Sequence, residues 1–170
     1  MKVCIPIRAN SEKELFDLLK KATQKKPDLI EIWLDELKNP DIGKILSSSK
    51  IPLILVNLTE VHEENFHEGI KHGVAFIDLE IEKTSISKIK KIIAQSSTGS
   101  RNGKKTKIIL SYHDFQKTPK CTEFEKIIKK MFALGADIAK IATLIKKDED
   151  SEIFFSLLRK MKKSRKKIII

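Results

Sequence analysis

Short apolar runs alternate with amphipathic stretches along the whole 170-residue chain. The runs are rich in Ile, Leu and Val and almost continuously hydrophobic, which is typical of strands buried on both faces of a sheet. They lie at Val3–Ile7, Leu29–Leu34, Leu53–Val56, Ala75–Ile81, Lys107–Ser111, Ile138–Ala142 and Ile168–Ile170. Between them, apolar residues recur at three- and four-residue spacing, as in the Leu15–Ala22 stretch, where Ser11 can cap a helix. This alternation predicts repeated βαβ units and a parallel sheet.

Seven such runs fit either an open doubly wound sheet or most of a (β/α)8 barrel, and two observations favour the barrel. No Gly-rich phosphate loop follows the first run, and polar residues lie at the carboxyl ends of several different runs, as in barrel enzymes. These polar residues are Glu31 and Asp35, Glu80 and Glu82, His113 and Asp114, and Lys140 and Thr143. We therefore predict a single α/β domain over residues 1–170, of (β/α)8 TIM-barrel type, with about seven βα units and the eighth strand missing.

Composition limits the partners of the chain. The formal net charge is +11, but the lysines are interleaved with Asp and Glu and aromatic residues make up 6% of the chain. This pattern indicates a solvated lysine-rich surface and a small anionic substrate, not nucleic acid. No apolar run is long enough to cross a membrane, and Met1–Ile7 lacks the pattern of a signal peptide.

Cysteine and histidine usage bears on metals and on the cell compartment. Cys4 and Cys121 lie far apart and show no metal-ligand spacing, which predicts two buried thiols in a reducing, cytoplasmic setting. His62, His67 and His72 fall in a polar segment whose other residues suggest no ligand geometry. We expect no metal site.

Lys140 interrupts the apolar run Ile138–Ala142. A lysine inside a buried strand costs several kcal/mol unless it is neutral, paired or facing a cavity. Desolvation lowers the pKa of an ammonium group, and Schiff-base chemistry requires the neutral amine. The alternative is a lysine on an edge strand that extends its stem to water. The flanking apolar residues favour a nucleophilic lysine.

His113 ends the run that precedes the Lys140 run, so a barrel would place both residues at one rim. Histidine can move protons near neutral pH, although a lone histidine can also be a cap or part of the core. Asp78, Glu80 and Glu82 alternate along one run and share a face. We favour Glu80 as the carboxylate that orients His113 and stabilises its protonated form. The alternative is that these carboxylates cap a helix or pair with lysines.

Four segments resemble type I 3-dehydroquinate dehydratase, in that family's order and over essentially the whole chain. They are Glu31-Ile32-Trp33-Leu34-Asp35, Asp78-Leu79-Glu80, Ser111-Tyr112-His113-Asp114-Phe115 followed by Thr118-Pro119, and the segment from Gly135 to Thr143. The resemblance implies a (β/α)8 barrel that converts 3-dehydroquinate to 3-dehydroshikimate in the shikimate pathway, with no metal or organic cofactor.

The resemblance also implies roles for individual residues. Lys140 would form an iminium with the substrate ketone, and His113 would remove the neighbouring proton and protonate the departing hydroxyl. Glu80 would orient His113, and Glu31 would bind a substrate hydroxyl.

The chain also departs from the family. Trp33 stands where the family has an arginine, no arginine or glycine pair occurs around Leu58, and the sequence stops at Ile170, before the family's later Ser-Arg segment. An arginine that binds an anion through two hydrogen bonds is not easily replaced. We predict that Arg8, just past the first run, supplies one anion contact.

The departures leave alternatives open. A barrel without its eighth strand exposes two sheet edges, and three outcomes follow: a gap, closure by a second copy in a homodimer or by a partner chain, or a truncated product of poor stability. The chain could also be a catalytically impaired or inactive barrel, or another Schiff-base barrel enzyme of the aldolase kind.

Overall fold

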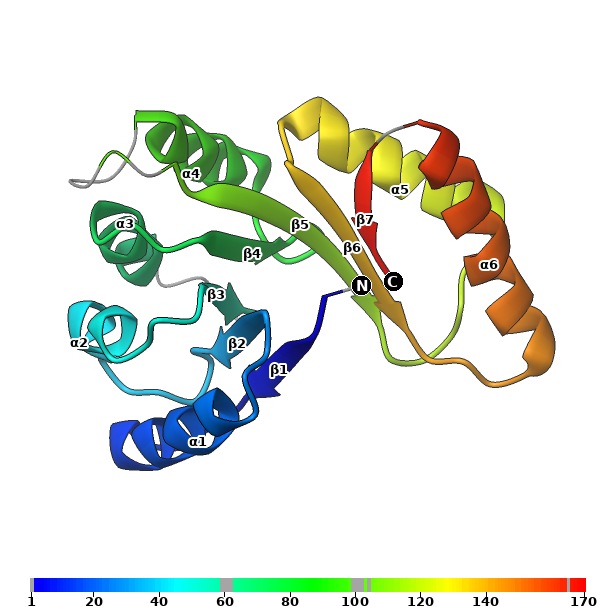
Figure 1. Cartoon of the computed structure of the whole chain (residues 1–170). Coiled ribbons are helices and arrows are strands. Elements are labelled where there is room, and N and C mark those ends of the chain that lie inside the picture. The colour runs from blue at the N-terminus through cyan, green and yellow to red at the C-terminus, as the bar shows by residue number, and fades with distance from the viewer. Residues whose placement is uncertain (1, 59–62, 99–102, 104, 165) are drawn as a thin grey trace.

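The computed structural model describes residues 2–58, 63–98, 103, 105–164 and 166–170. In this part of the chain, seven parallel strands form one sheet in chain order. The sheet curls, and the helices pack on its outer side (Figure 1). The strands are β1 Cys4–Ile7, β2 Leu29–Trp33, β3 Leu53–Asn57, β4 Phe76–Glu80, β5 Lys107–Asp114, β6 Ile138–Thr143 and β7 Lys167–Ile169. The predicted incomplete barrel is confirmed.

The helices follow from local sequence signals. They are α1 Glu12–Gln24, α2 Ile42–Ser47, α3 Glu63–Lys71, α4 Ile86–Thr98, α5 Cys121–Leu134 and α6 Asp148–Lys163. The Ser11 hydroxyl accepts the Glu14 backbone N–H at 3.3 Å and so caps α1, as predicted. Gly135 ends α5 with a φ of 105°, a conformation that glycine adopts without strain. The sequence did not predict α2, because its 6 residues carry no repeated apolar stripe.

Two apolar clusters hold the sheet. The larger one lies between the sheet and the helices and includes the fully buried Phe66 and Phe124. The smaller one comprises Ile54, Val56, Leu58 and Ile109, with Trp33 among the side chains packed against it. Its members alternate with outward-facing residues, so this cluster fills the inside of the curl. Inward-facing side chains nearer the carboxyl ends of the strands therefore pack on this apolar cluster.

The two ends of the sheet are unpaired in the described part of the chain, where β1 pairs with β2 alone and β7 with β6 alone. Large apolar side chains are exposed beside β7 and α6, and a hollow of about 480 Å³ lies among them. They are Leu144, Ile145, Phe155, Leu158, Ile169 and Ile170. The two strands with unpaired edges are the first and the last, as the sequence predicted. That a partner chain or a second copy of this chain covers them stays a prediction. None of the described helices combines the length and the hydropathy that a membrane crossing requires.

Candidate active site

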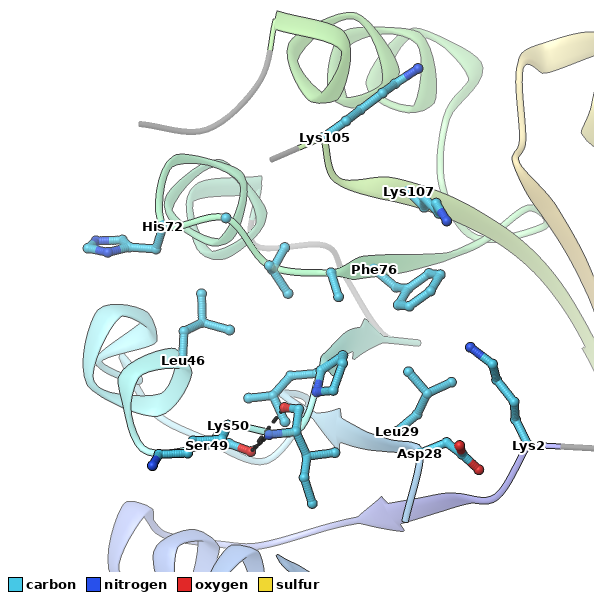
Figure 2. A pocket seen from close by; sticks show the side chains of 16 residues that line it. Lys2, Asp28, Leu29, Leu46, Ser49, Lys50, His72, Phe76, Lys105 and Lys107 are labelled. Carbon is cyan, nitrogen blue, oxygen red and sulfur yellow. Dashed lines mark hydrogen bonds between the residues drawn. The ribbon is translucent and has the colours of Figure 1, made fainter. Parts of the chain in front are cut away.

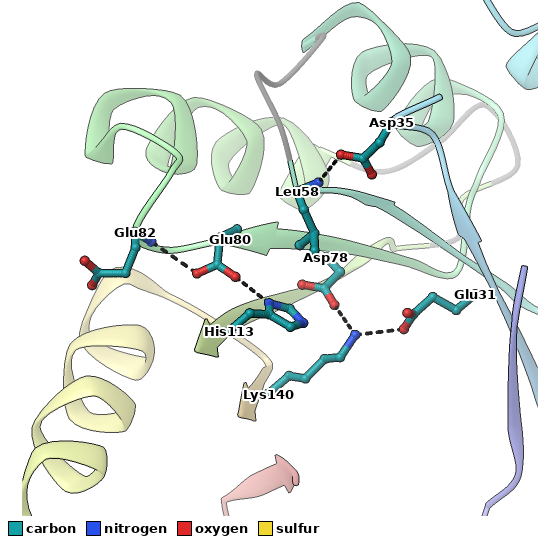
Figure 3. Close-up of polar contacts among 8 residues, drawn as sticks. All are labelled: Glu31, Asp35, Leu58, Asp78, Glu80, Glu82, His113 and Lys140. Atoms are coloured by element: carbon teal, nitrogen blue, oxygen red, sulfur yellow. Dashed lines mark hydrogen bonds and ion pairs between the residues drawn. The ribbon is translucent and has the colours of Figure 1, made fainter. Parts of the chain in front are cut away.

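The strand register brings the predicted site residues to one rim. Ser111 of β5 pairs with Glu80 of β4 on one side and with Lys140 of β6 on the other. His113 lies two residues further along β5 and therefore faces the same way as Ser111. In Figure 3 the side chains of Glu80, His113 and Lys140 converge inside the curl, near the carboxyl ends of the strands.

Lys140 binds two carboxylates. Its Nζ donates to Glu31 Oε2 of β2 and to Asp78 Oδ2 of β4, each at 2.9 Å (Figure 3). The side chain of Lys140 is 12% exposed, and that of Asp78 is completely buried. Because β6 lies between β5 and β7, the alternative of an edge-strand lysine reaching for water does not hold. The ammonium is buried and paired.

This pairing reverses the expected pKa shift of Lys140. Burial alone lowers the pKa of the ammonium, but the charges and hydrogen bonds of Asp78 and Glu31 outweigh it, so the pKa is raised above its ordinary value. The expectation of a lowered pKa was therefore wrong, because it considered burial without the carboxylates that the curled sheet brings close to Lys140. Burial also raises the pKa of Asp78, while the nearby ammonium acts in the opposite direction. Burial thus favours the protonated form of the carboxyl group that lies next to the Lys140 ammonium.

Replacing Asp78 with asparagine is expected to lower the pKa of Lys140, because burial would then be opposed by one carboxylate instead of two. Reductive methylation, followed by peptide mapping over a pH series, should label Lys140 at lower pH in Asp78→Asn than in the wild type. The matched control is Glu82→Gln, since Glu82 is exposed at the same rim and its side chain points away from Lys140 (Figure 3). Identical profiles for Asp78→Asn and the wild type would contradict the expectation.

His113 is held from two sides. Its Nδ1 lies 2.5 Å from Glu80 Oε2, and the two side chains are 6% and 2% exposed. Phe115 stacks on the imidazole, with ring centroids 5.8 Å apart and planes at 27°. With Nδ1 directed at the carboxylate, Nε2 is left as the ring nitrogen that can take up or release a proton. The structure therefore brings Glu80 to His113, as the sequence predicted.

Glu31, Trp33 and Arg8 continue the site towards β1. Trp33 Nε1 donates to Glu31 Oε1 at 2.9 Å, and the guanidinium carbon of Arg8 lies 4.3 Å from the centre of the indole ring. Both oxygens of Glu31 thus bind protein groups, one the indole and the other Lys140. The predicted contact of Glu31 with a substrate hydroxyl stays a prediction. Arg8 lies at the rim, where the sequence placed it.

Sequence reasoning passed over two residues of this site. Asp78 was recognised as sharing a face with Glu80 but was not favoured, and the signal that could have found it was its place in the middle of a buried strand, where a carboxylate needs a cation. Trp33 was noted only as a departure from the family pattern. Its indole N–H and its spacing of two residues from Glu31 on one strand were the available signal.

Both cysteines were predicted to be buried thiols, and this was wrong. Cys4 is exposed and Cys121 is partly exposed. Cys4 belongs to β1, an end strand of the sheet, which explains its exposure. Partial burial of the thiol, followed by the negative charge of Glu31, nevertheless raises the pKa of Cys4 to about 11. At neutral pH Cys4 is a thiol and a weak nucleophile beside Lys140.

The histidines of the polar segment form helix contacts where the structure describes them. His67 and His72 lie 3.8 Å and 3.4 Å from Glu63 and Glu68 respectively, one turn earlier in each case. His62 lies outside the described residues. Within the described ranges, no group of three or more His, Cys, Asp or Glu residues is placed to hold a metal ion.

A second hollow, of about 650 Å³, lies at the opposite, amino-terminal ends of the strands (Figure 2). Lys2, Lys50, Lys105 and Lys107 line it, but Lys50 and Lys105 extend away from its centre. Asp28 accepts the Val3 backbone N–H at 2.7 Å and so serves the turn before β2. In barrel folds this end contributes to stability, whereas the carboxyl ends carry the chemistry.

The curled parallel sheet, with a buried lysine, a histidine and three carboxylates brought together inside its curl, defines a TIM-barrel-like protein with an enzyme-type site. The family model described as type I 3-dehydroquinase matches residues 3–170. The chain belongs to this family.

Curated relatives and solved structures point to the same family. The 3-dehydroquinate dehydratase of Methanococcus maripaludis is 30% identical over 169 residues, covering 93% of this chain and 74% of the relative. That of Methanococcus vannielii is 33% identical over 159 residues, covering 87% and 69%. A type I 3-dehydroquinate dehydratase structure from Clostridium difficile, with covalently modified comenic acid, superposes with a TM-score of 0.82 at 25% identity and covers 94% of this chain and 69% of that one. The Geobacillus kaustophilus 3-dehydroquinate dehydratase, with a TM-score of 0.83 at 17% identity and coverage of 99% and 72%, shares the fold.

Proposed function

We propose that this chain is a 3-dehydroquinate dehydratase, a carbon–oxygen lyase that acts through a Schiff base on Lys140. The observation that carries the proposal is the convergence at one rim of a carboxylate-paired lysine and a carboxylate-held histidine. Family membership and the names of the relatives support the same reaction. No cofactor enters the scheme, because the lysine itself supplies the electron sink.

The first step makes Lys140 nucleophilic. Its ammonium transfers a proton to Asp78, whose buried carboxylate has a raised pKa and lies 2.9 Å away. The neutral amine then attacks the substrate ketone, forming a carbon–nitrogen bond. The ketone oxygen leaves as water, with His113 supplying a proton, and an iminium remains.

The second step removes water from the substrate. The positively charged iminium makes the neighbouring C–H acidic, and His113 Nε2 takes this proton while the C–H electrons form an enamine. The enamine then expels the hydroxyl group on the next carbon, which leaves as water after protonation by His113. Hydrolysis of the resulting conjugated iminium releases 3-dehydroshikimate and restores Lys140, so the net change is the loss of one water.

The remaining site residues hold the participants. Glu80 keeps His113 oriented through the 2.5 Å contact, and Phe115 stacks on the solvent side of the imidazole. In this scheme Arg8, which lies over Trp33, would meet the substrate carboxylate, and Glu31 would accept a hydrogen bond from a substrate hydroxyl once Lys140 has reacted. The reaction belongs to the shikimate pathway of aromatic amino acid biosynthesis, in the cytoplasm.

Incubation with 3-dehydroquinate tests the proposal. The conjugated product absorbs ultraviolet light more strongly than the unconjugated substrate, and its mass is lower than that of the substrate by one water. The wild type and the control variant Glu82→Gln should both form it. Absence of product at stoichiometric protein would overturn the proposal in favour of an inactive barrel, and carbon–carbon cleavage products would indicate the aldolase alternative.

A further inference from the structure

Four side chains form a continuous series of contacts from the edge of the sheet to the reactive lysine. The guanidinium of Arg8 lies over the indole of Trp33, the indole N–H donates to Glu31, and Glu31 accepts from Lys140. The two hydrogen bonds are both 2.9 Å long. The series runs from Arg8, which directly follows β1, through Trp33 and Glu31 of β2 to Lys140 of β6, all within one continuously paired sheet.

Trp33 fixes the orientation of Glu31. Glu31 is 8% exposed, so a carboxylate oxygen that lost its donor would have little water to replace it. The indole supplies that donor to Oε1, and Oε2 is then directed at Lys140. Trp33 itself packs against the inner apolar cluster of Ile54, Val56, Leu58 and Ile109. A donor on a packed ring has few alternative orientations.

The other face of Trp33 carries Arg8. The distance of 4.3 Å from the guanidinium carbon to the ring centre is that of a cation–π contact. Arg8 is exposed, and no ion pair joins it to a carboxylate within the described part of the chain. Its planar group of N–H donors therefore remains available to an anion, while the indole limits where the group can lie.

We propose that Trp33 is a positioning residue with two separable functions. Its N–H holds Glu31 against Lys140 and so maintains the protonated lysine before substrate arrives. Its ring face holds the Arg8 guanidinium at the rim, where it meets the carboxylate of the substrate. The first function stands on the contacts alone, whereas the second rests on the proposed dehydratase function.

Two substitutions separate these functions. Trp33→Phe removes the N–H and keeps a ring under Arg8, whereas Trp33→Leu removes both. The matched control is Phe76→Leu, because Phe76 is also partly buried on the inner face and carries a lysine, Lys107, 5.8 Å from its ring centre, without contacting Glu31. Equal unfolding midpoints in urea would show that the variants are folded.

The first readout needs no substrate. In Trp33→Phe, the weaker hold on Glu31 should raise the methylation of Lys140 at neutral pH by roughly threefold to tenfold, with the pH profile displaced to lower pH. Phe76→Leu should match the wild type. An unchanged profile in Trp33→Phe, or an equal displacement in Phe76→Leu, would overturn the first function, whether or not the chain dehydrates 3-dehydroquinate.

The second readout is the KM for 3-dehydroquinate. Trp33→Phe should leave it within about twofold of the wild type, and Trp33→Leu should raise it by about tenfold, as should Arg8→Ala. Because Trp33→Leu and Arg8→Ala act through the same guanidinium, the double variant Trp33→Leu/Arg8→Ala should have a KM little higher than that of either single variant. A wild-type KM in Trp33→Leu would overturn the second function, and so would full additivity. If Trp33→Leu does not fold, a raised KM in Trp33→Phe would itself overturn it.

Discussion

Replacing Lys140 with methionine is expected to lower the rate of 3-dehydroquinate dehydration by at least about 10³-fold, because the nucleophile that forms the iminium is lost. Methionine keeps the unbranched stem of the side chain, one atom shorter than lysine, but cannot bind Glu31 or Asp78. Steady-state measurement of product formation checks the rate. Retention of more than a tenth of the wild-type rate would contradict a Schiff base on Lys140.

The same substitution should also destabilise the fold, which must be separated from the chemical effect. Removing the ammonium leaves Asp78, completely buried, and Glu31 without their cation, and breaking such a buried pair costs about 3–5 kcal/mol. The double variant Lys140→Met/Asp78→Asn removes one of the two carboxylates left without a cation. It should recover part of the free energy of unfolding measured in urea and none of the activity. Recovery of activity together with stability would show that Lys140 acts only as a structural ion.

Replacing His113 with glutamine is expected to lower turnover by about 10²- to 10⁴-fold, the usual range for loss of a general acid–base group. Lys140 keeps its two carboxylates in this variant, so iminium formation should be slowed without being abolished. Borohydride trapping should therefore still give an adduct on Lys140 while product formation is nearly lost.

The matched control for this variant is His72→Gln. His72 also lies beside a glutamate, but it directly follows α3 and lines the hollow at the amino-terminal ends of the strands. It should leave turnover unchanged. If His113→Gln turned over at the wild-type rate, another group would have to move the protons. If it formed no adduct at all while remaining folded, the proton that His113 supplies to the leaving ketone oxygen would be indispensable, and the expectation that iminium formation is only slowed would be wrong.

Periodicity predicted the fold well because burial on two faces leaves a strong signal. The run Leu53–Val56 is apolar throughout and the run Ile138–Ala142 is apolar apart from Lys140, and both became inner strands of the sheet. Strand ends were less predictable. β5 extends to Asp114, past the predicted end at Ser111, because hydrogen bonding to β6 continues through polar residues that carry no hydrophobic signal.

The site was predictable in its reacting residues and less so in their partners. Lys140 and His113 could be found because each stands against an apolar background. The pairing of Lys140 with Asp78 and Glu31 joins residues 62 and 109 positions apart, and it depends on strand register, which a single sequence does not contain. The direction of the Lys140 pKa shift depends on those carboxylates, so the expectation based on burial alone had the wrong sign. The contact of Trp33 with Glu31 was hidden for a different reason, since an aromatic residue on a strand is ordinarily explained by packing.

Borohydride trapping of the wild-type chain with 3-dehydroquinate, followed by peptide mass mapping, tests the central claim most directly. A reduced Schiff base would add the mass of the substrate or product, less one oxygen, to the peptide that contains Lys140. The adduct should form only when both 3-dehydroquinate and borohydride are present, and Lys140→Met should lack it. Product formation with no adduct on Lys140, or an adduct located on another lysine in a chain that dehydrates 3-dehydroquinate, would contradict the account.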